Sequence, residues 1–334
     1  MRIGIDLMGS DHSPLALFDG VVQAAKMFPA ASFVLFVDKE SASSLQDLLK
    51  PLQKFGGPLA SIQFHIAEQV VSMHDDPMSA IRHKKKSSMI LGIKELKRKA
   101  LDAFITSGNT GALMASATLT LPLLPSVRRP GLLASLPTER APLAVLDVGS
   151  YLLCKAEHLV NFAKIGSVYQ RVYNKILKPR VALLNIGSES KKGTAEHQKA
   201  YQLLKEEAAK EEYEFLGNVE GREVFQGKVD VLVTDGFTGN VFLKTTEGVA
   251  SFILEFLKKS SSAAPSTHLQ HLIQELQSHF SYAEYPGAVL LGVDGIVIKC
   301  HGAASSKALF NAIKAAIVYV EGDLIEKIKH SLEI

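Results

Sequence analysis

The chain has 334 residues, of which 47% are hydrophobic and 21% are charged. This composition is typical of a folded globular protein, and it excludes a disordered chain and a small disulfide-held scaffold. The net charge of +3, the 7% of aromatic residues and the absence of Trp give no support to nucleic-acid binding. We therefore expect no nucleic acid among the partners.

Short β-rich runs alternate with helical patterns along the chain. The predicted strands are Arg2–Asp6, Ser32–Val37, Ile62–Ile66, Ala103–Thr106, Leu143–Asp147, Val181–Asn185, Val229–Thr234, Val289–Leu291 and Gly295–Ile298. The predicted helices are Leu15–Met27, Ser41–Gln53, Met89–Lys99, Glu157–Tyr173, Ala195–Lys210, Gly239–Lys258 and Ser305–Lys329. This alternation predicts an α/β fold in which a mostly parallel sheet carries helices on both faces. We expect residues 1–334 to form one catalytic α/β unit, either as a single body or as two subdomains around a cleft.

The first residues carry Asp6 and Asp11 where a signal peptide needs an apolar segment, so we expect a cytoplasmic protein. Residues 103–127 contain no charge and are long enough to span a bilayer. They also contain the turn sequence SGNTG and two prolines, Pro122 and Pro125. We therefore predict a buried strand, a loop and a helix over this stretch rather than a membrane span.

Several sequence motifs for cofactor and metal chemistry are absent. The chain lacks G-x-G-x-x-G, G-x-x-x-x-G-K-[ST], H-E-x-x-H and G-x-S-x-G. These absences disfavour a standard dinucleotide-binding enzyme, a P-loop NTPase, a zincin and an α/β-hydrolase. No group of His, Cys, Asp or Glu has convincing metal-ligand spacing. We expect neither a cofactor nor a metal.

Three loops with polar and glycine residues follow predicted strands. Their sequences are ITSGNTGALM, LLNIGSESKKGT and LVTDGFTGNVFLKT. Glycines let a ligand approach the backbone, and a helix that begins after such a loop offers free N–H groups to an anion. Each loop alone is most simply a turn, but three of them at strand–helix junctions predict an anion-binding cleft. The residues we assign to it are Gly108, Asn109, Thr110, Gly111, Asp235, Gly236, Thr238 and Gly239.

The N-terminal loop adds Asp6, Asp11 and His12 to these candidate binding residues. The alternatives are that Asp11 caps a helix and that His12 is a hydrogen-bonded polar group without a catalytic role. A basic run, Arg82-His83-Lys84-Lys85-Lys86, is most simply a solvated face. It is also suited to an acidic partner or a phosphorylated ligand.

Residues 251–282 predict an amphipathic helical projection. Apolar residues recur at helical spacing in two stretches separated by the polar link Ser260–Pro265. The first stretch has Phe252, Ile253, Phe256 and Leu257, and the second has Leu269, Leu272, Ile273, Leu276 and Phe280. Ordinary packing on the core is the simplest interpretation of either helix, and a membrane or dimer contact is the alternative.

Nine motifs follow one another between Met1 and about Ala315: IDLMGSDHSP, IRHKKKSSM, SGNTGALM, RRPGLLASLPT, AEHLVNFAKIGSVY, PRVALLNIGSESKKGT, FLGNVEGRE, VTDGFTGNVFLKTTEG and VIKCHGAASSKALFNAI. Together they resemble the PlsX family of phosphate acyltransferases. The chain departs from the family pattern in two places. Leu7 and Ser10 replace an alanine and a glycine of the first loop, and Tyr151 to Cys154 replace a polar region that contains asparagine and aspartate.

The resemblance implies transfer of an acyl group from acyl carrier protein (ACP) to inorganic phosphate, which supplies acyl phosphate for phospholipid synthesis. It implies a fold similar to the isocitrate and isopropylmalate dehydrogenases and the phosphotransacetylases. It also implies a homodimer that associates weakly with the membrane surface. Within this family pattern, Lys192 and Asn240 lie at the reaction centre. We further expect Arg82, Lys84 and Lys85 to dock the acidic carrier protein.

The chemistry of this reaction agrees with the missing catalytic triad. Phosphate is already a nucleophile, and a thiolate leaves readily because the pKa of a thiol is about 8.5. The protein needs to hold the dianion near the carbonyl and to stabilise the oxyanion that forms. Three alternatives remain at this stage: a phosphotransacetylase that uses coenzyme A, an NAD-dependent 2-hydroxyacid dehydrogenase, and a non-catalytic phosphate-binding scaffold at the membrane.

Overall fold

A computed structural model describes residues 1–53, 61–210, 213–263, 270, 273–276 and 287–333. All of its named strands belong to one eleven-stranded sheet with the order β3-β2-β1-β4-β11-β10-β5-β6-β9-β7-β8. The strands are β1 (Arg2–Asp6), β2 (Ser32–Val37), β3 (Ile62–Ile66), β4 (Ala103–Thr106), β5 (Gly131–Leu136), β6 (Leu143–Leu146), β7 (Arg180–Leu184), β8 (Glu214–Val219), β9 (Val231–Val233), β10 (Ala288–Leu291) and β11 (Ile296–Lys299).

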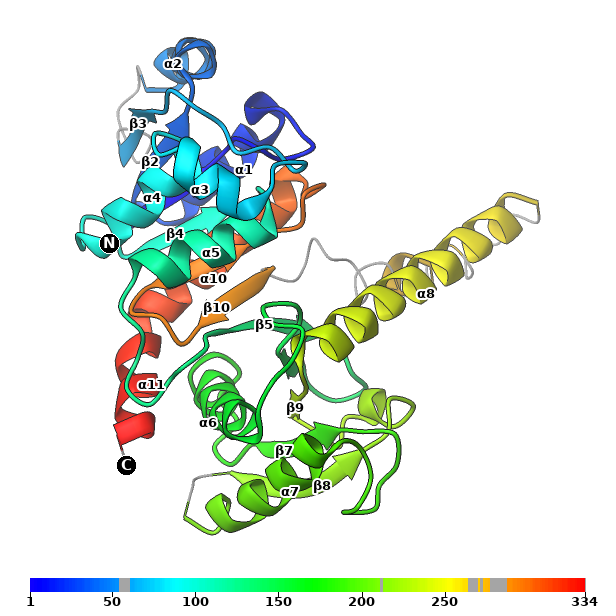
Figure 1. The fold of residues 1–334 in the computed structure, drawn as a ribbon. Helices are drawn as coiled ribbons and strands as arrows, with labels where there is room; N and C mark the ends of the chain where they lie inside the picture. The colour runs from blue at the N-terminus through cyan, green and yellow to red at the C-terminus, as the bar shows by residue number, and fades with distance from the viewer. Residues whose placement is uncertain (54–60, 211–212, 264–269, 271–272, 277–286, 334) are drawn as a thin grey trace.

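The sheet consists of two parallel regions joined by antiparallel strands. Strands β3, β2, β1, β4 and β11 are mutually parallel, and so are β6, β9, β7 and β8. Strands β10 and β5 connect the two regions through antiparallel pairing on both of their edges. Figure 1 shows these regions as two lobes, with β10 and β5 between them. The expectation of a mostly parallel sheet is confirmed.

Helices cover both faces of the sheet, as predicted. They are α1 (Pro14–Met27), α2 (Lys39–Gln53), α3 (Pro77–His83), α4 (Ser88–Lys97), α5 (Thr110–Thr120), α6 (Ala156–Tyr173), α7 (Ala195–Glu207), α8 (Gly236–Ala263), α10 (Ser306–Glu321) and α11 (Leu324–Glu333). One buried cluster joins the sheet to α1, α6, α7, α10 and α11. A second cluster, on the opposite face, joins it to α4 and α5, with the early part of α8 packed at its margin.

Residues 103–127 adopt the predicted strand, loop and helix. Strand β4 is fully buried, and α5 follows it after a short loop. Among the described residues, no helix is both long enough and apolar enough to cross a membrane.

The structure corrects two helix predictions. The helix predicted over Ser305–Lys329 is interrupted, because Asp323 takes a left-handed backbone conformation (φ 50°) between α10 and α11. The helix predicted over Gly239–Lys258 begins at Gly236 and continues through the serines to Ala263. Phe252 therefore lies in the distal half of a 28-residue helix that extends away from the two lobes (Figure 1), and not in a separate short helix.

The second predicted helix of the projection falls mainly on residues outside those that the structure describes, including Leu269, Leu272 and Phe280. Of its described apolar residues, Ile273 is buried and Leu276 is half-buried.

Candidate active site

Three polar side chains lie in one row at the carboxyl ends of adjacent parallel strands. Asp6 of β1 is in register with Thr106 of β4, and Thr106 is in register with Lys299 of β11. Residues paired in this way point to the same face of a sheet. All three are buried. The strand ends thus place a carboxylate, a hydroxyl and an ammonium group beside the loops that the sequence singled out.

Asp6 organises the first two of these loops. Its carboxylate accepts hydrogen bonds from the backbone N–H of Met8 at 2.9 Å and from the hydroxyl of Thr106 at 2.9 Å, and Thr106 accepts one from the N–H of Gly108 at 3.0 Å. Burial raises the pKa of Asp6 to about 6 against the opposing effect of these hydrogen bonds. Asp6 therefore holds the binding loops in place.

The raised pKa of Asp6 predicts a specific pH dependence of stability. Between pH 4 and pH 6 the folded state holds a proton on Asp6 that the unfolded chain has released. The free energy of unfolding should therefore fall by about 3 kcal/mol as the pH rises through this interval. Asp6→Asn should remove this contribution. The check is denaturant unfolding of both proteins at pH 4, 5, 6 and 7; parallel curves for the two proteins would contradict the assignment.

The loop before α5 is held by the side chain of Asn109. Its Oδ1 accepts from the N–H of Ala112 at 3.0 Å and so caps the helix, while its Nδ2 donates to the carbonyls of Ser72, Met73 and Asp75. Asn109 is thus a positioning residue. Its neighbour Thr110, the first residue of α5, lines the cavity described below.

Packing requires a glycine at position 111, and Gly108 also lies close to a neighbouring side chain. A Cβ at Gly111 would lie 2.6 Å from Cγ of Pro77, at the start of α3, and one at Gly108 would lie 2.8 Å from Cε of Met89. The two glycines therefore let α3 and α4 pack closely against the loop that presents Thr110.

A buried carboxylate also organises the start of α8. Asp147, directly after β6, accepts hydrogen bonds from the backbone N–H groups of Leu132, Gly149, Ser150 and Tyr151, at 3.0 to 3.2 Å. Burial raises its pKa despite these donors. Together they shape the 147–151 turn, against which α8 packs.

The G-x-x-G sequence of α8 fits this turn. A Cβ at Gly236 would lie 2.5 Å from Oδ2 of Asp147, and one at Gly239 would lie 1.9 Å from the Asp147 carbonyl oxygen. Asp235 caps the helix, since its carboxylate accepts from the N–H and the hydroxyl of Thr238 at 2.9 and 2.8 Å. These four residues therefore position the first turn of α8, and the residue that they bring to the site is Asn240.

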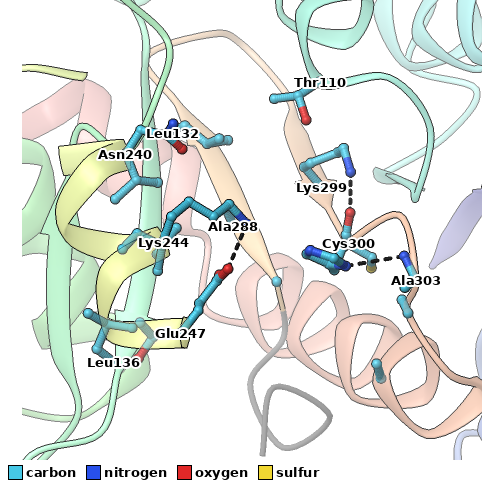
Figure 2. Close-up of a pocket in the computed structure, with 18 of the residues that line it drawn as sticks. Thr110, Leu132, Leu136, Asn240, Lys244, Glu247, Ala288, Lys299, Cys300 and Ala303 are labelled. Atoms are coloured by element: carbon cyan, nitrogen blue, oxygen red, sulfur yellow. Dashed lines mark hydrogen bonds and ion pairs between the residues drawn. The ribbon is translucent and has the colours of Figure 1, made fainter. Parts of the chain in front are cut away.

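The loops and α8 enclose a cavity of about 760 Å³ (Figure 2). Its polar lining residues are Thr110, Ser135, Asn240, Lys244, Glu247, Ser251, Lys299, His301 and Ser305. Its apolar and small residues include Leu132, Ala134, Leu136, Leu243, Leu254, Ala288 and Ala308. The lining residues on α8 run from Asn240 to Leu254, a helix length of about 21 Å at 1.5 Å per residue. The cavity therefore combines charged and polar groups with apolar side chains along its length.

The other predicted site residues lie around this cavity without lining it. Asp11 and His12 occupy an exposed loop, where the N–H of Asp11 donates to the Gly302 carbonyl at 3.0 Å. Lys192 follows β7, is about half-exposed, and lies 3.8 Å from Glu189. His197, at the start of α7, lies 4.0 Å from Asp235, which places the α7 end of the Lys192 loop beside the cap of α8. The structure thus brings Thr110 and Asn240 to the cavity wall and leaves Lys192 outside it.

Three charged residues of the cavity were not selected from the sequence. Lys244 and Glu247 form an ion pair at 2.7 Å one turn apart on α8, and Lys299 is 8% exposed at the end of β11. Lys299 directly follows the predicted strand Gly295–Ile298 and lies in the quoted motif VIKCHGAASSKALFNAI, so the rule that functional residues follow strands pointed to it. Lys244 and Glu247 lie in the quoted motif VTDGFTGNVFLKTTEG, but within a predicted helix and not directly after a strand.

The loop that departs from the family pattern is an exposed apolar segment. Leu152 and Leu153 are 73% and 82% exposed. The guanidinium of Arg129 lies 4.8 Å from the ring centroid of Tyr151 and donates to the carbonyl of Leu153 at 2.9 Å. Tyr151, one of the replaced residues, nevertheless donates its backbone N–H to the Asp147 carboxylate at 3.1 Å. Among the described residues, no group of three or more His, Cys, Asp or Glu is placed to hold a metal ion.

The two-lobed sheet, with a cavity between its lobes and a long helix along the cavity, is the fold of phosphotransacetylases. Solved phosphotransacetylases from Streptococcus pyogenes (TM-score 0.60, 13% identity, 98% of this chain and 94% of that chain) and Staphylococcus aureus (TM-score 0.59, 14% identity, 95% and 94%) share it. At this identity the likeness shows the fold alone.

Sequence comparison identifies the family. A family model described as "Fatty acid synthesis protein" matches residues 1–327. Proteins named phosphate acyltransferase are 40% identical to the chain in Chlamydia pneumoniae, over 99% of both chains, and in Thermoanaerobacter pseudethanolicus, over 100% of this chain and 98% of that one. The chain belongs to the PlsX family of phosphate acyltransferases, as its motifs indicated.

Proposed function

We propose that this enzyme transfers the acyl group of acyl-ACP to inorganic phosphate and so supplies acyl phosphate for phospholipid synthesis. The observation that carries the proposal is the mixed lining of the cavity, in which the polar groups of Thr110, Asn240 and Lys299 share one space with apolar residues of β5, α8 and α10. A phosphate dianion and a fatty acyl chain need these two environments side by side.

The reaction needs few groups from the protein. A phosphate oxygen attacks the thioester carbonyl carbon, the carbonyl oxygen becomes an oxyanion, and the intermediate collapses with breakage of the C–S bond. The carrier leaves as a thiolate and takes a proton from solvent, while the new C–O bond remains in acyl phosphate. None of the hydrogen bonds recorded among the described residues uses the Asn240 amide, so this group is available to donate to the oxyanion.

Hydroxylamine trapping tests this function and its donor. Purified protein, inorganic phosphate and palmitoyl-ACP should give palmitoyl hydroxamate, because hydroxylamine captures acyl phosphate as it forms. Palmitoyl-coenzyme A in place of palmitoyl-ACP should give much less. A phosphate-independent signal, or a preference for coenzyme A, would reject the proposal in favour of another acyl transfer or of a phosphotransacetylase-like enzyme.

The basic run at the end of α3 supports a carrier-docking site, but with fewer cations than the sequence predicted. Lys84 is committed to the protein's own fold, because its Nζ lies 2.5 Å from the Asp75 carboxylate and donates to the Val70 carbonyl at 2.9 Å. Arg82 and Lys85 are exposed. They lie at the end of α3, which packs through Pro77 on Gly111 beside the cavity residue Thr110. We therefore propose Arg82 and Lys85 as the docking cations.

Charge reversal tests this surface. Arg82→Glu combined with Lys85→Glu should raise the KM for acyl-ACP several-fold at low salt and leave the KM for phosphate unchanged, since steering acts on the acidic carrier. The difference should shrink as salt rises. Lys26→Glu combined with Lys314→Glu makes the same change in net charge on α1 and α10 and should have little effect. An unchanged KM for acyl-ACP in the Arg82→Glu and Lys85→Glu variant would show that the basic run is only a solvated surface.

The distal half of α8 supports the proposed homodimer and weak membrane association. Phe252 and Phe256 are 70% and 62% exposed, and their ring centroids lie 6.4 Å apart. Exposed aromatic residues on a projecting helix fit either a second copy or a bilayer surface.

Phe252→Ser combined with Phe256→Ser should lower the solution mass from dimer to monomer or abolish co-sedimentation with anionic vesicles. Leu119→Ser combined with Leu123→Ser removes exposed apolar side chains outside α8 and serves as the control. If the phenylalanine variant keeps both the dimer mass and the vesicle binding of the wild type, this face of α8 is not the contact.

A further inference from the structure

Lys299 is a buried cation without a fixed counter-ion. Its side chain is 8% exposed, and none of the ion pairs recorded among the described residues includes it. Its Nζ donates to the backbone carbonyls of Ser107, at 3.3 Å, and Cys300. An ammonium group has three N–H donors, so one is left over. Burial of such a charge is unfavourable unless an anion compensates for it.

The surroundings of Lys299 are suited to a small anion. The carbonyl of Ser107 orients its ammonium beside the loop that leads into α5, and Thr110 begins that helix. Figure 2 shows Thr110 and Lys299 on the same wall of the cavity, opposite the α8 residues. The first turn of α5 adds the positive end of a helix dipole, with only the N–H of Ala112 satisfied by the Asn109 cap. Lys244 on the opposite wall differs, because Glu247 already neutralises it.

We propose that Lys299 is the cation that binds inorganic phosphate in this cavity, together with the hydroxyl of Thr110 and the free N–H groups at the start of α5. This inference rests on the proposed function, because it takes inorganic phosphate to be the co-substrate. It assigns phosphate to the α5 and β11 wall, and it leaves Asn240 on the α8 wall for the carbonyl oxygen of the acyl donor.

The titration of Lys299 gives this assignment a signature. Burial lowers the pKa of Lys299 to about 8, so the group is largely protonated at pH 7 and largely neutral at pH 9. The titratable groups that interact with it are Cys300 and His301, directly after β11, Lys244 on α8, Asp11 in the N-terminal loop and Asp6 on β1. Phosphate binding should therefore weaken above pH 8 through loss of this charge. An arginine at the position would keep its charge over the same range.

The test is calorimetric binding of inorganic phosphate, with no acyl donor present, at pH 7 and pH 9. Lys299→Gln should raise the Kd for phosphate at least about tenfold at pH 7, as expected for loss of a charge-assisted contact. Lys299→Arg should retain binding, and wild type should lose affinity relative to this variant at pH 9. Lys314→Gln, an exposed lysine on α10, should bind as wild type does.

Two results would overturn the assignment: wild-type affinity in Lys299→Gln, or a ratio of wild-type to Lys299→Arg affinity that does not change with pH. The second comparison decides the matter even if the glutamine variant does not fold. Lys299-dependent phosphate binding without acyl phosphate formation would reject the proposed function and leave this inference standing. If the enzyme forms acyl phosphate and Lys299→Gln still binds phosphate as wild type does, the proposed function stands and this inference is rejected.

Discussion

Asn240→Ala is expected to lower kcat by roughly 10²- to 10³-fold, because removal of one oxyanion donor typically costs about 2.7–4 kcal/mol of transition-state stabilisation. The melting temperature should stay within a degree or two of wild type, since Asn240 is exposed in the cavity and lies on the first turns of α8 without a recorded side-chain hydrogen bond. The KM for phosphate should change little. Steady-state kinetics and thermal unfolding of the same preparation check both expectations.

Thr245→Ala is the matched control for Asn240→Ala, because Thr245 is exposed on the same helix and does not line the cavity. Lys192→Ala is the second variant to be measured in the same kinetic experiment. We expect it to lower kcat as well, as the family pattern implies, although Lys192 is half-exposed outside the cavity. Wild-type turnover in either alanine variant would remove that residue from the active site.

Gly239→Ala is expected to abolish activity and to lower the free energy of unfolding by about 3 kcal/mol or more. The added Cβ would lie 1.9 Å from the carbonyl oxygen of Asp147 and 2.8 Å from Cγ2 of Thr234. The first of these is a backbone atom, so relief requires α8 to move away from the 147–151 turn. That movement would displace Asn240 and expose the cavity to solvent.

Gly248→Ala separates this clash from the general effect of an alanine in α8. A Cβ at Gly248 meets nothing within 4 Å, so this variant should gain about 0.5–1 kcal/mol of stability from helix propensity. Chemical denaturation of the two variants and wild type checks the pair. Equal stabilities for Gly239→Ala and wild type would show that α8 does not depend on close contact with Asp147.

All the parallel strands except Glu214–Val219 were predictable, because their own side chains favour an extended backbone. Ser32–Val37 and Ile62–Ile66 form strands at the predicted bounds, since β-branched and aromatic residues there are followed by turn or helix signals. Two strands were missed. Gly131–Leu136 lies between prolines and pairs with its neighbours in antiparallel fashion, and Glu214–Val219 is a short edge strand. Their place in the sheet depends on tertiary pairing that no local pattern encodes.

The loops of the candidate site were predictable from the sequence, but the structural role of each residue in those loops was not. The sequence marked the glycines of α8 as points of ligand approach, whereas Gly236 and Gly239 pack against the turn formed by Asp147. Asp147, which lies far from these glycines in the sequence, creates the need for them, so the spacing of the glycines alone does not reveal it. Lys299 shows the converse case: it ends a short apolar strand, and its burial beside Ser107 becomes visible only when β4 and β11 pair.

The most direct test of acyl transfer to phosphate is ³¹P NMR of the purified protein mixed with palmitoyl-ACP and inorganic phosphate. A new acyl phosphate resonance should grow as the inorganic phosphate signal falls, in step with the release of free carrier thiol measured in the same sample. Release of the thiol without a new phosphorus resonance would show hydrolysis of the thioester instead, and would contradict the account.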